Sequence, residues 1–137
     1  MALVCDTGPL YAAMDRADQD HDTCARLLEA TDDEVIVPSP VLVEVDWLAG
    51  QRLHPDAFLS FLADIDAGRL GIVDVQAQDY RRVSELLDRY RDLPLGFVDA
   101  AVLAIVERLK ETKVATLDRR HFSIVRPRHL PALRLIP

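Results

Sequence analysis

Four carboxylates occupy positions where the neighbouring residues are apolar. Asp6 and Asp118 each end a short apolar run, and Glu44 and Asp99 interrupt longer apolar segments. A buried carboxylate without a partner costs several kcal/mol, so each of these groups needs an Arg, a Lys or a bound cation nearby. A cluster of carboxylate oxygens suits Mg²⁺ or Mn²⁺, which are hard cations with oxygen ligands.

Each acid taken alone also fits a local role. These roles are a helix cap for Asp6, a solvated face for Glu44, an ion pair with Arg for Asp99 and a turn for Asp118. The interpretation as one site therefore depends on whether the fold brings the four together.

The apolar pattern predicts alternating strands and helices. Predicted strands are 2–5, 34–37, 70–73 and 113–117, with small strands or edges at 122–125 and 133–136. Predicted helices are 9–14, 23–30, 40–50, 55–68, 77–90 and 97–109. Strands that alternate with helices predict an α/β fold with a parallel sheet. The chain length of 137 residues predicts one domain, spanning 1–137.

These elements would bring the four acids to one place. Asp6 and Asp118 lie at the C-terminal ends of predicted strands, where open α/β sheets bind their ligands. Glu44 and Asp99 lie near the starts of helices that follow strands or breaks. The same edge of the sheet is therefore expected to collect all four carboxylates.

Charge is distributed unevenly along the chain. The net charge is −7, but residues 108–137 carry eight Lys or Arg and only two acids, a net of +6. The basic residues of this segment include Arg119 and Arg120, which directly follow Asp118, and also Arg126, Arg128, Arg134, His121 and His129. We expect them to form a basic rim beside the acids, where Lys and Arg would contact phosphate without reading sequence.

Several classes of protein are excluded. No run reaches the ~18–20 apolar residues of a membrane span, and the first residues do not resemble a secretory signal. Cys5 and Cys24 have no zinc-site or disulfide-motif spacing, so we expect two reduced thiols in a cytoplasmic protein that has no membrane partner.

The acidic segments also carry a family resemblance. The chain resembles the PIN-domain ribonucleases, specifically the VapC toxins of type II toxin–antitoxin systems. The matching segments, in the family's order and spacing, are Val4–Leu10, Pro38–Val45, Gly96–Ala101 and Ala115–Phe122. Each segment alone is a weak signal, whereas the four together are specific.

The resemblance implies a three-layer α/β/α sandwich with a mostly parallel central sheet. It implies a Mg²⁺- or Mn²⁺-dependent endoribonuclease that hydrolyses RNA phosphodiester bonds as a toxin. Its catalytic residues would be Asp6, Glu44, Asp99 and Asp118, with Asp6 and Asp99 as the main metal ligands. Thr7 and Thr116 would orient the acids at the substrate site, beside Arg119 and Arg120. The implied partners are an RNA substrate and a cognate antitoxin, in a homodimer or a toxin–antitoxin hetero-oligomer.

Three other functions would also use acids on a small α/β scaffold. A phosphoacceptor receiver domain needs a Lys after a late strand, whereas Lys113 precedes its strand. A haloacid-dehalogenase-like phosphatase needs Asp-x-Asp after the first strand, and here Gly8 stands in the second acidic position. A non-catalytic RNA- or protein-binding module on the same scaffold stays open, although binding alone does not require four acids.

Overall fold

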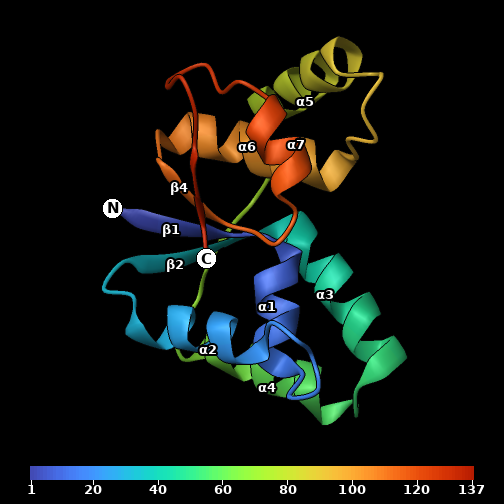
Figure 1. The fold of residues 1–137 in the computed structure, drawn as a ribbon, viewed down its shortest axis with the longest axis vertical. Coiled ribbons are helices and arrows are strands. Elements are labelled where there is room, and N and C mark those ends of the chain that lie inside the picture. The colour runs from blue at the N-terminus through green and yellow to red at the C-terminus, as the bar shows by residue number, and fades with distance from the viewer.

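A parallel β-sheet with helices on both faces forms the centre of the computed structural model, which describes residues 1–137 (Figure 1). The strands are β1 (Ala2–Cys5), β2 (Glu34–Pro38), β3 (Gly71–Val73), β4 (Lys113–Ala115) and β5 (Arg134–Ile136). Their order across the sheet is β3-β2-β1-β4-β5, and every neighbouring pair is parallel. The predicted three-layer α/β architecture is therefore confirmed.

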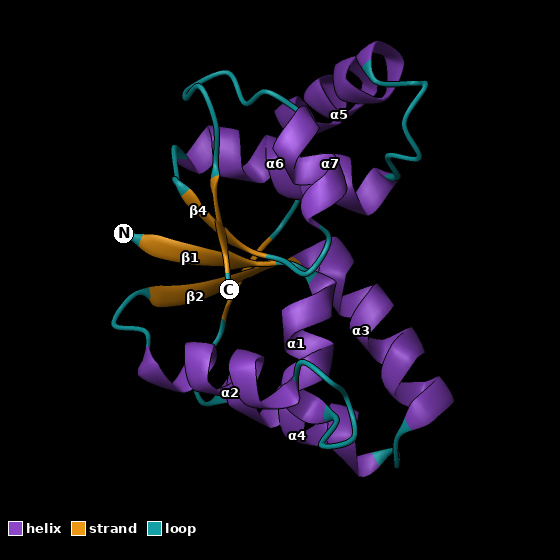
Figure 2. Cartoon of the chain, in the orientation of Figure 1, coloured by secondary structure: helices purple, strands orange, loops and turns teal.

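Seven helices cover the sheet. They are α1 (Thr7–Met14), α2 (His21–Ala30), α3 (Ser39–Arg52), α4 (Asp56–Asp66), α5 (Ala77–Arg89), α6 (Phe97–Leu109) and α7 (Arg119–Ile124). Helices α1 to α4 lie on one side of the sheet and α5 to α7 on the other (Figure 2). None of them combines the length and the apolar character needed to cross a membrane.

Strand β1 is the central strand and is buried along its whole length. Leu3 aligns with Val35 of β2 on one side and with Lys113 of β4 on the other. A strand buried on both faces needs a continuous apolar sequence, which residues 2–5 supply. The register then fixes where β1 ends, and Asp6 is the next residue.

Helix α6 is the most deeply buried helix. All seven residues from Ala100 to Val106 are buried, so this helix packs on nearly all sides. A helix that is apolar all round is stable only inside a core. Asp99 lies in the first turn of this helix, directly before the buried run.

The sequence predictions for the elements are mostly confirmed, with one clear error. Residues 97–109 form a helix with the predicted bounds, and residues 134–136 form an edge strand. Residues 122–125 were expected to form a strand or edge, but Phe122 lies in helix α7, which ends at Ile124. A four-residue apolar run has too little periodicity to distinguish a strand from a helical turn.

Candidate active site

Two of the four acids follow the neighbouring strands β1 and β4. The order in which strands are added to the sheet reverses between these two strands. The chain builds β1, β2 and β3 outward on one side and then places β4 on the other side of β1. Asp6 follows β1, and Asp118 lies three residues beyond the end of β4. Ligands of open α/β sheets bind at such a switch point, outside the carboxyl ends of the strands.

Two threonine hydroxyls connect the acids to the scaffold. Thr116 Oγ1 donates a hydrogen bond of 3.0 Å to Asp6 Oδ2 and accepts one of 3.1 Å from the backbone N–H of Asp118. Thr7 Oγ1 donates a hydrogen bond of 2.6 Å to Glu44 Oε1, which joins the start of α1 to α3. These contacts fix which way the carboxylates of Asp6 and Glu44 point.

The four carboxylates differ in burial. Asp6 is buried and only 6 % exposed, whereas Asp99 and Asp118 are half-buried. Glu44 lies in the second turn of α3 and is exposed, so the expectation that it sits in an apolar environment is wrong. The apolar residues around Glu44 in the sequence lie on other faces of the helix, since successive helical residues point in different directions.

Two of the acids, Asp6 and Asp99, have raised pKa values. Burial raises the pKa of Asp6 from an ordinary 3.8 to about 6, and the negative charges of Asp99 and Glu44 add to the rise. Hydrogen bonds from the Thr7 backbone and the Thr116 hydroxyl oppose this effect. The pKa of Asp99 is also raised by burial and by its acidic neighbours, against the Gly96 N–H and the charge of His121. The site is therefore short of positive charge.

His121 was expected on the basic rim, but it lies within the cluster of acids. This residue is buried in α7, and its Nδ1 lies 3.1 Å from Asp118 Oδ2 and 3.3 Å from Asp99 Oδ2. The two contacts are at ion-pair distance but lack hydrogen-bond geometry, which leaves Nδ1 without a hydrogen-bond partner. The i,i+3 spacing of Asp118 and His121 was the one sequence signal for this contact, and it becomes visible only if α7 is read as a helix.

The donor set fits a divalent cation of the Mg²⁺ type. All four acids offer hard oxygen atoms, and the buried Asp6 carboxylate has like charges as neighbours. No three carboxylate, imidazole or thiol side chains lie close enough together to enclose an ion by themselves. Mg²⁺ does not need such a cage, because it keeps several waters and is usually held by one or two carboxylates. A site of that kind would need only the buried Asp6 carboxylate and Asp99, whose charge acts on it.

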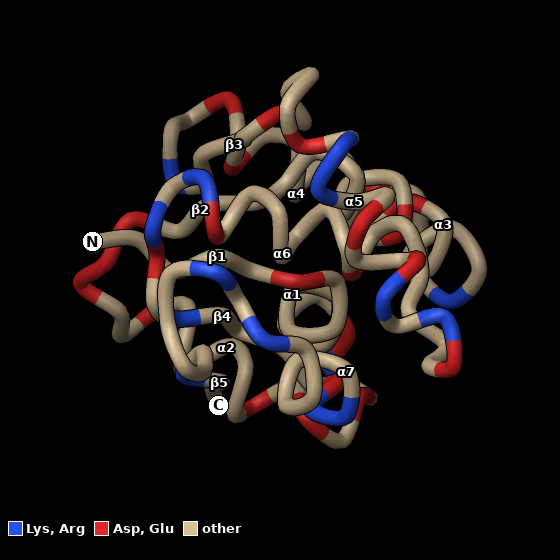
Figure 3. Tube along the Cα trace, turned by 90° about the horizontal axis from the view of Figure 1, so that it is seen from above, with Lys and Arg blue, Asp and Glu red and all other residues tan.

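The basic rim is narrower than predicted. Lys and Arg positions gather around β4, β5 and α7 (Figure 3), but only Arg119 and Arg120 line the cavity of about 480 Å³ beside Asp6 and Asp118. The Arg120 side chain is 84 % exposed, whereas the Arg119 guanidinium donates hydrogen bonds to the carbonyls of Leu135 and Pro137.

The other predicted rim residues do not share this cavity. Arg128 and His129 line a separate cavity beside α5 and α6, where Arg128 pairs with Glu85. The sequence placed them near Asp118 only through proximity along the chain. The irregular segment that leads to β5 instead carries them to another part of the surface.

Comparisons with known proteins agree with this arrangement. A family model described as the PIN domain matches residues 3–126. The chain is 30% identical over 125 residues to the protein named Ribonuclease VapC26 from Mycobacterium tuberculosis, which covers 91% of this chain and 93% of that protein.

Two solved structures share the fold. The first is Mycobacterium tuberculosis VapC20, a sarcin-ricin loop cleaving toxin, with a TM-score of 0.80 at 22% identity, covering 87% of this chain and 92% of that one. The second is a toxin–antitoxin complex from Klebsiella pneumoniae, with a TM-score of 0.69 at 17% identity, covering 94% of this chain and 100% of the matched chain.

Proposed function

This chain belongs to the PIN-domain family, and we propose that it is a divalent-metal-dependent endoribonuclease acting as the toxin of a toxin–antitoxin pair. The observation that carries the proposal is the buried Asp6 carboxylate, whose pKa is raised by burial and by Asp99 and Glu44 beside it. Keeping such a group at the ligand-binding edge of a sheet is unfavourable unless a cation is to be held there. The curated relative, at 30% identity, is named a ribonuclease.

Each acid has a distinct role in the proposed reaction. Asp6 and Asp99 hold the Mg²⁺ or Mn²⁺ ion, and Thr116 keeps the Asp6 carboxylate in its binding orientation. When bound, the ion lowers the pKa of water and offsets the charge of the scissile phosphate. Glu44, oriented by Thr7, and Asp118 accept hydrogen bonds from the attacking water and align it with the phosphorus.

RNA reaches these acids along the basic side of the site. The exposed Arg120 and the neighbouring Arg119 lie next to Asp118 and contact the phosphates that flank the scissile bond. Their positive charge reduces the repulsion between an acidic site and a polyanion. Such contacts add affinity but carry no sequence information.

The proposed protein partner is a cognate antitoxin that covers the acidic site, in a toxin–antitoxin hetero-oligomer or with the toxin as a homodimer. One structural neighbour is a toxin–antitoxin complex, which supports this assignment. We place the protein in the cytoplasm, since both of its cysteines are free and a reducing compartment keeps thiols in that state.

The decisive experiment measures RNA cleavage by the purified protein in Mg²⁺, in Mn²⁺ and in EDTA. Asp6→Asn and Asp99→Asn should each lower cleavage more than the ~10–100-fold typical of changes outside the ligand shell. Asp66→Asn, an exposed acid on α4, is the matched control and should cleave as the wild type does. Expression of the wild type should arrest growth, and both site variants should relieve the arrest.

Undiminished cleavage in either site variant, or in EDTA, would contradict the assigned roles. RNA binding that survives in a wild-type protein unable to cleave any RNA would identify a non-catalytic module instead.

A further inference from the structure

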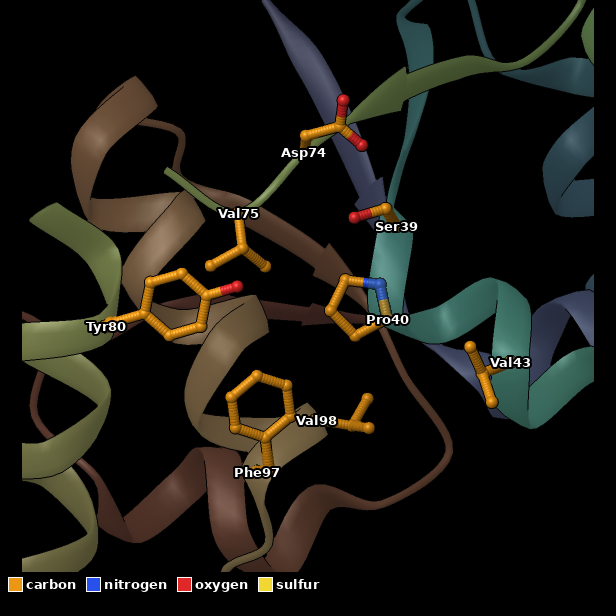
Figure 4. Close-up of a pocket in the computed structure, with 8 residues that line it drawn as sticks. All are labelled: Ser39, Pro40, Val43, Asp74, Val75, Tyr80, Phe97 and Val98. Atoms are coloured by element: carbon orange, nitrogen blue, oxygen red, sulfur yellow. The ribbon is translucent and has the colours of Figure 1, made fainter. Parts of the chain in front are cut away.

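A further cavity is mostly apolar, in contrast to the charged cavity that Asp6 and Asp118 line. Its volume is about 660 Å³, and it opens between α3, α5 and α6 (Figure 4). The residues that line it are Ser39, Pro40, Val43, Asp74, Val75, Tyr80, Phe97 and Val98. A pocket of this size accepts a small planar molecule, and clefts of about 300–1,000 Å³ are typical ligand sites.

Two aromatic rings form one wall of this pocket. Tyr80 of α5 and Phe97 of α6 stack with their ring centroids 6.4 Å apart and their planes inclined by 23° (Figure 4). Both are large side chains left in contact with water, since Tyr80 is 56% exposed and Phe97 is 45% exposed. Exposed apolar surface gathered into a cleft marks a binding site more often than isolated exposed residues do.

The pocket adjoins the catalytic acids through the chain itself. Val43 precedes Glu44, and Val98 precedes Asp99. Val43 also lines a smaller cavity of about 340 Å³ together with Thr7, Glu44 and the exposed Trp47. The apolar pocket therefore shares Val43 with a cavity that Glu44 itself lines.

The lining chemistry indicates which part of a nucleotide each side can take. No Lys or Arg lines the apolar pocket, so it offers no positive charge to a phosphate. Ser39 and Asp74 provide hydrogen-bonding oxygens, and the rings provide a flat apolar surface. A nucleobase has that combination of a π-face and a polar edge, and every base can stack on an aromatic side chain.

We propose that this pocket binds a nucleobase of the RNA next to the scissile phosphate, stacked on Tyr80 and Phe97. The phosphate then lies over the acids and the backbone continues past Arg120. This inference rests on the proposed ribonuclease function, and it adds the part of the nucleotide that is bound beside the scissile phosphate.

The first test measures binding and needs no catalysis. In an Asp6→Asn background, a fluorescent single-stranded RNA is titrated with the protein carrying Phe97→Ala, Tyr80→Ala or neither. Loss of stacking should weaken binding about 5- to 150-fold for each variant. Leu59→Ala, at an exposed apolar residue on α4, should bind as the parent does. Phe97→Tyr should retain affinity and Phe97→Leu should not, because only the former keeps a ring.

The second test asks whether the contact is with a base. An RNA with one mapped cleavage site is compared with the same RNA lacking the base on either side of that site. Removing the base that occupies the pocket should slow cleavage by the wild type about as much as Phe97→Ala slows cleavage of the intact RNA. The two changes together should slow cleavage little more than either change alone.

Three results would overturn the inference. The first is unchanged RNA affinity in both alanine variants, and the second is full RNA affinity in Phe97→Leu. The third is a cleavage rate for Phe97→Ala on the abasic RNA that is reduced by the product of the two separate reductions. A shift from dimer to monomer in Phe97→Ala and Tyr80→Ala would also overturn it, because the face would then be an interface between copies. If no RNA is cleaved but the ring-dependent loss of binding remains, the ribonuclease proposal fails while the base site stands.

Discussion

The Thr116 hydroxyl donates a hydrogen bond of 3.0 Å to Asp6 Oδ2 across 110 residues of sequence. Thr116 follows β4 and Asp6 follows β1, so the pairing of these two strands creates the contact. The same hydroxyl accepts the backbone N–H of Asp118, which links two of the site acids through one side chain.

Replacing Thr116 by Val should impair the site while keeping its shape. The variant loses the hydroxyl that orients Asp6, so its affinity for Mn²⁺ and its cleavage rate should fall about 10–100-fold. Thr116→Ser retains the hydroxyl and should stay close to wild type. The check is titration with Mn²⁺ by calorimetry beside RNA cleavage, and equal affinities for the Val and Ser variants would exclude the orienting role.

Asp6 should make the metal-free protein less stable as the pH rises. Its pKa in the folded state is raised to about 6 from 3.8, so the folded protein binds this proton more tightly than the unfolded chain does. The contribution of the Asp6 proton to the free energy of unfolding is fully present below pH ~4. It is lost as the pH rises through ~6, by an amount on the order of 3 kcal/mol. Asp6→Asn lacks this titration and should exceed wild type in free energy of unfolding at pH 7.5, with little difference at pH 4.

This comparison is made by urea denaturation in EDTA at both pH values. Asp66→Asn serves as the control for removing an exposed acid. A difference in free energy of unfolding between wild type and Asp6→Asn that stays the same at both pH values would contradict the prediction.

A bound divalent metal ion should offset the loss of stability that the ionised Asp6 causes at neutral pH. An ion bound between Asp6 and Asp99 stabilises the folded state, by about 2.7 kcal/mol when it is present at ~100 times its dissociation constant. Because the ion and the proton compete for Asp6, the stabilisation should fall as the pH is lowered through ~6. Thermal unfolding with and without Mg²⁺ measures this, and a Tm shift in Asp6→Asn as large as in wild type would place the ion elsewhere.

Arg120 should contribute more to RNA affinity than its neighbour Arg119. Arg120 is exposed and has only a long contact, 3.9 Å, with Asp118, whereas Arg119 donates hydrogen bonds to the backbone oxygens of Leu135 and Pro137. Arg120→Gln should weaken RNA binding and reduce the slope of log K against log salt by ~0.7. Arg26→Gln, at an exposed position on α2, should leave the slope unchanged. A larger slope change for Arg119→Gln than for Arg120→Gln would reverse the assignment.

The ion pair of Arg82 and Glu107 should support the fold without affecting metal binding. Their contacts are 2.8 and 2.9 Å long, and the side chains are only 12% and 8% exposed. Glu107→Ala leaves the Arg82 charge buried without its main partner, which should lower the free energy of unfolding by about 3–5 kcal/mol. Glu29→Ala, at an exposed site, is the control, and calorimetry should find the same Mn²⁺ affinity in all three proteins.

The sequence by itself determined the type of most elements and the edge of the sheet at which Asp6 lies. Residues 97–109 are apolar over a length that only a buried helix satisfies, and residues 2–5 are apolar as a central strand requires. Asp6 directly follows β1, and so its position at the sheet edge follows from the strand alone. These properties are local or periodic, and the sequence therefore contains them.

Only the tertiary structure decided which side chains meet. His121 of α7 lies 3.3 Å from Asp99 in the first turn of α6, and Tyr80 stacks on Phe97 because α5 packs against α6. Glu44 is exposed although its neighbours in sequence are apolar. Contacts of this kind depend on strand register and helix packing between distant segments, and local residue preferences do not specify them.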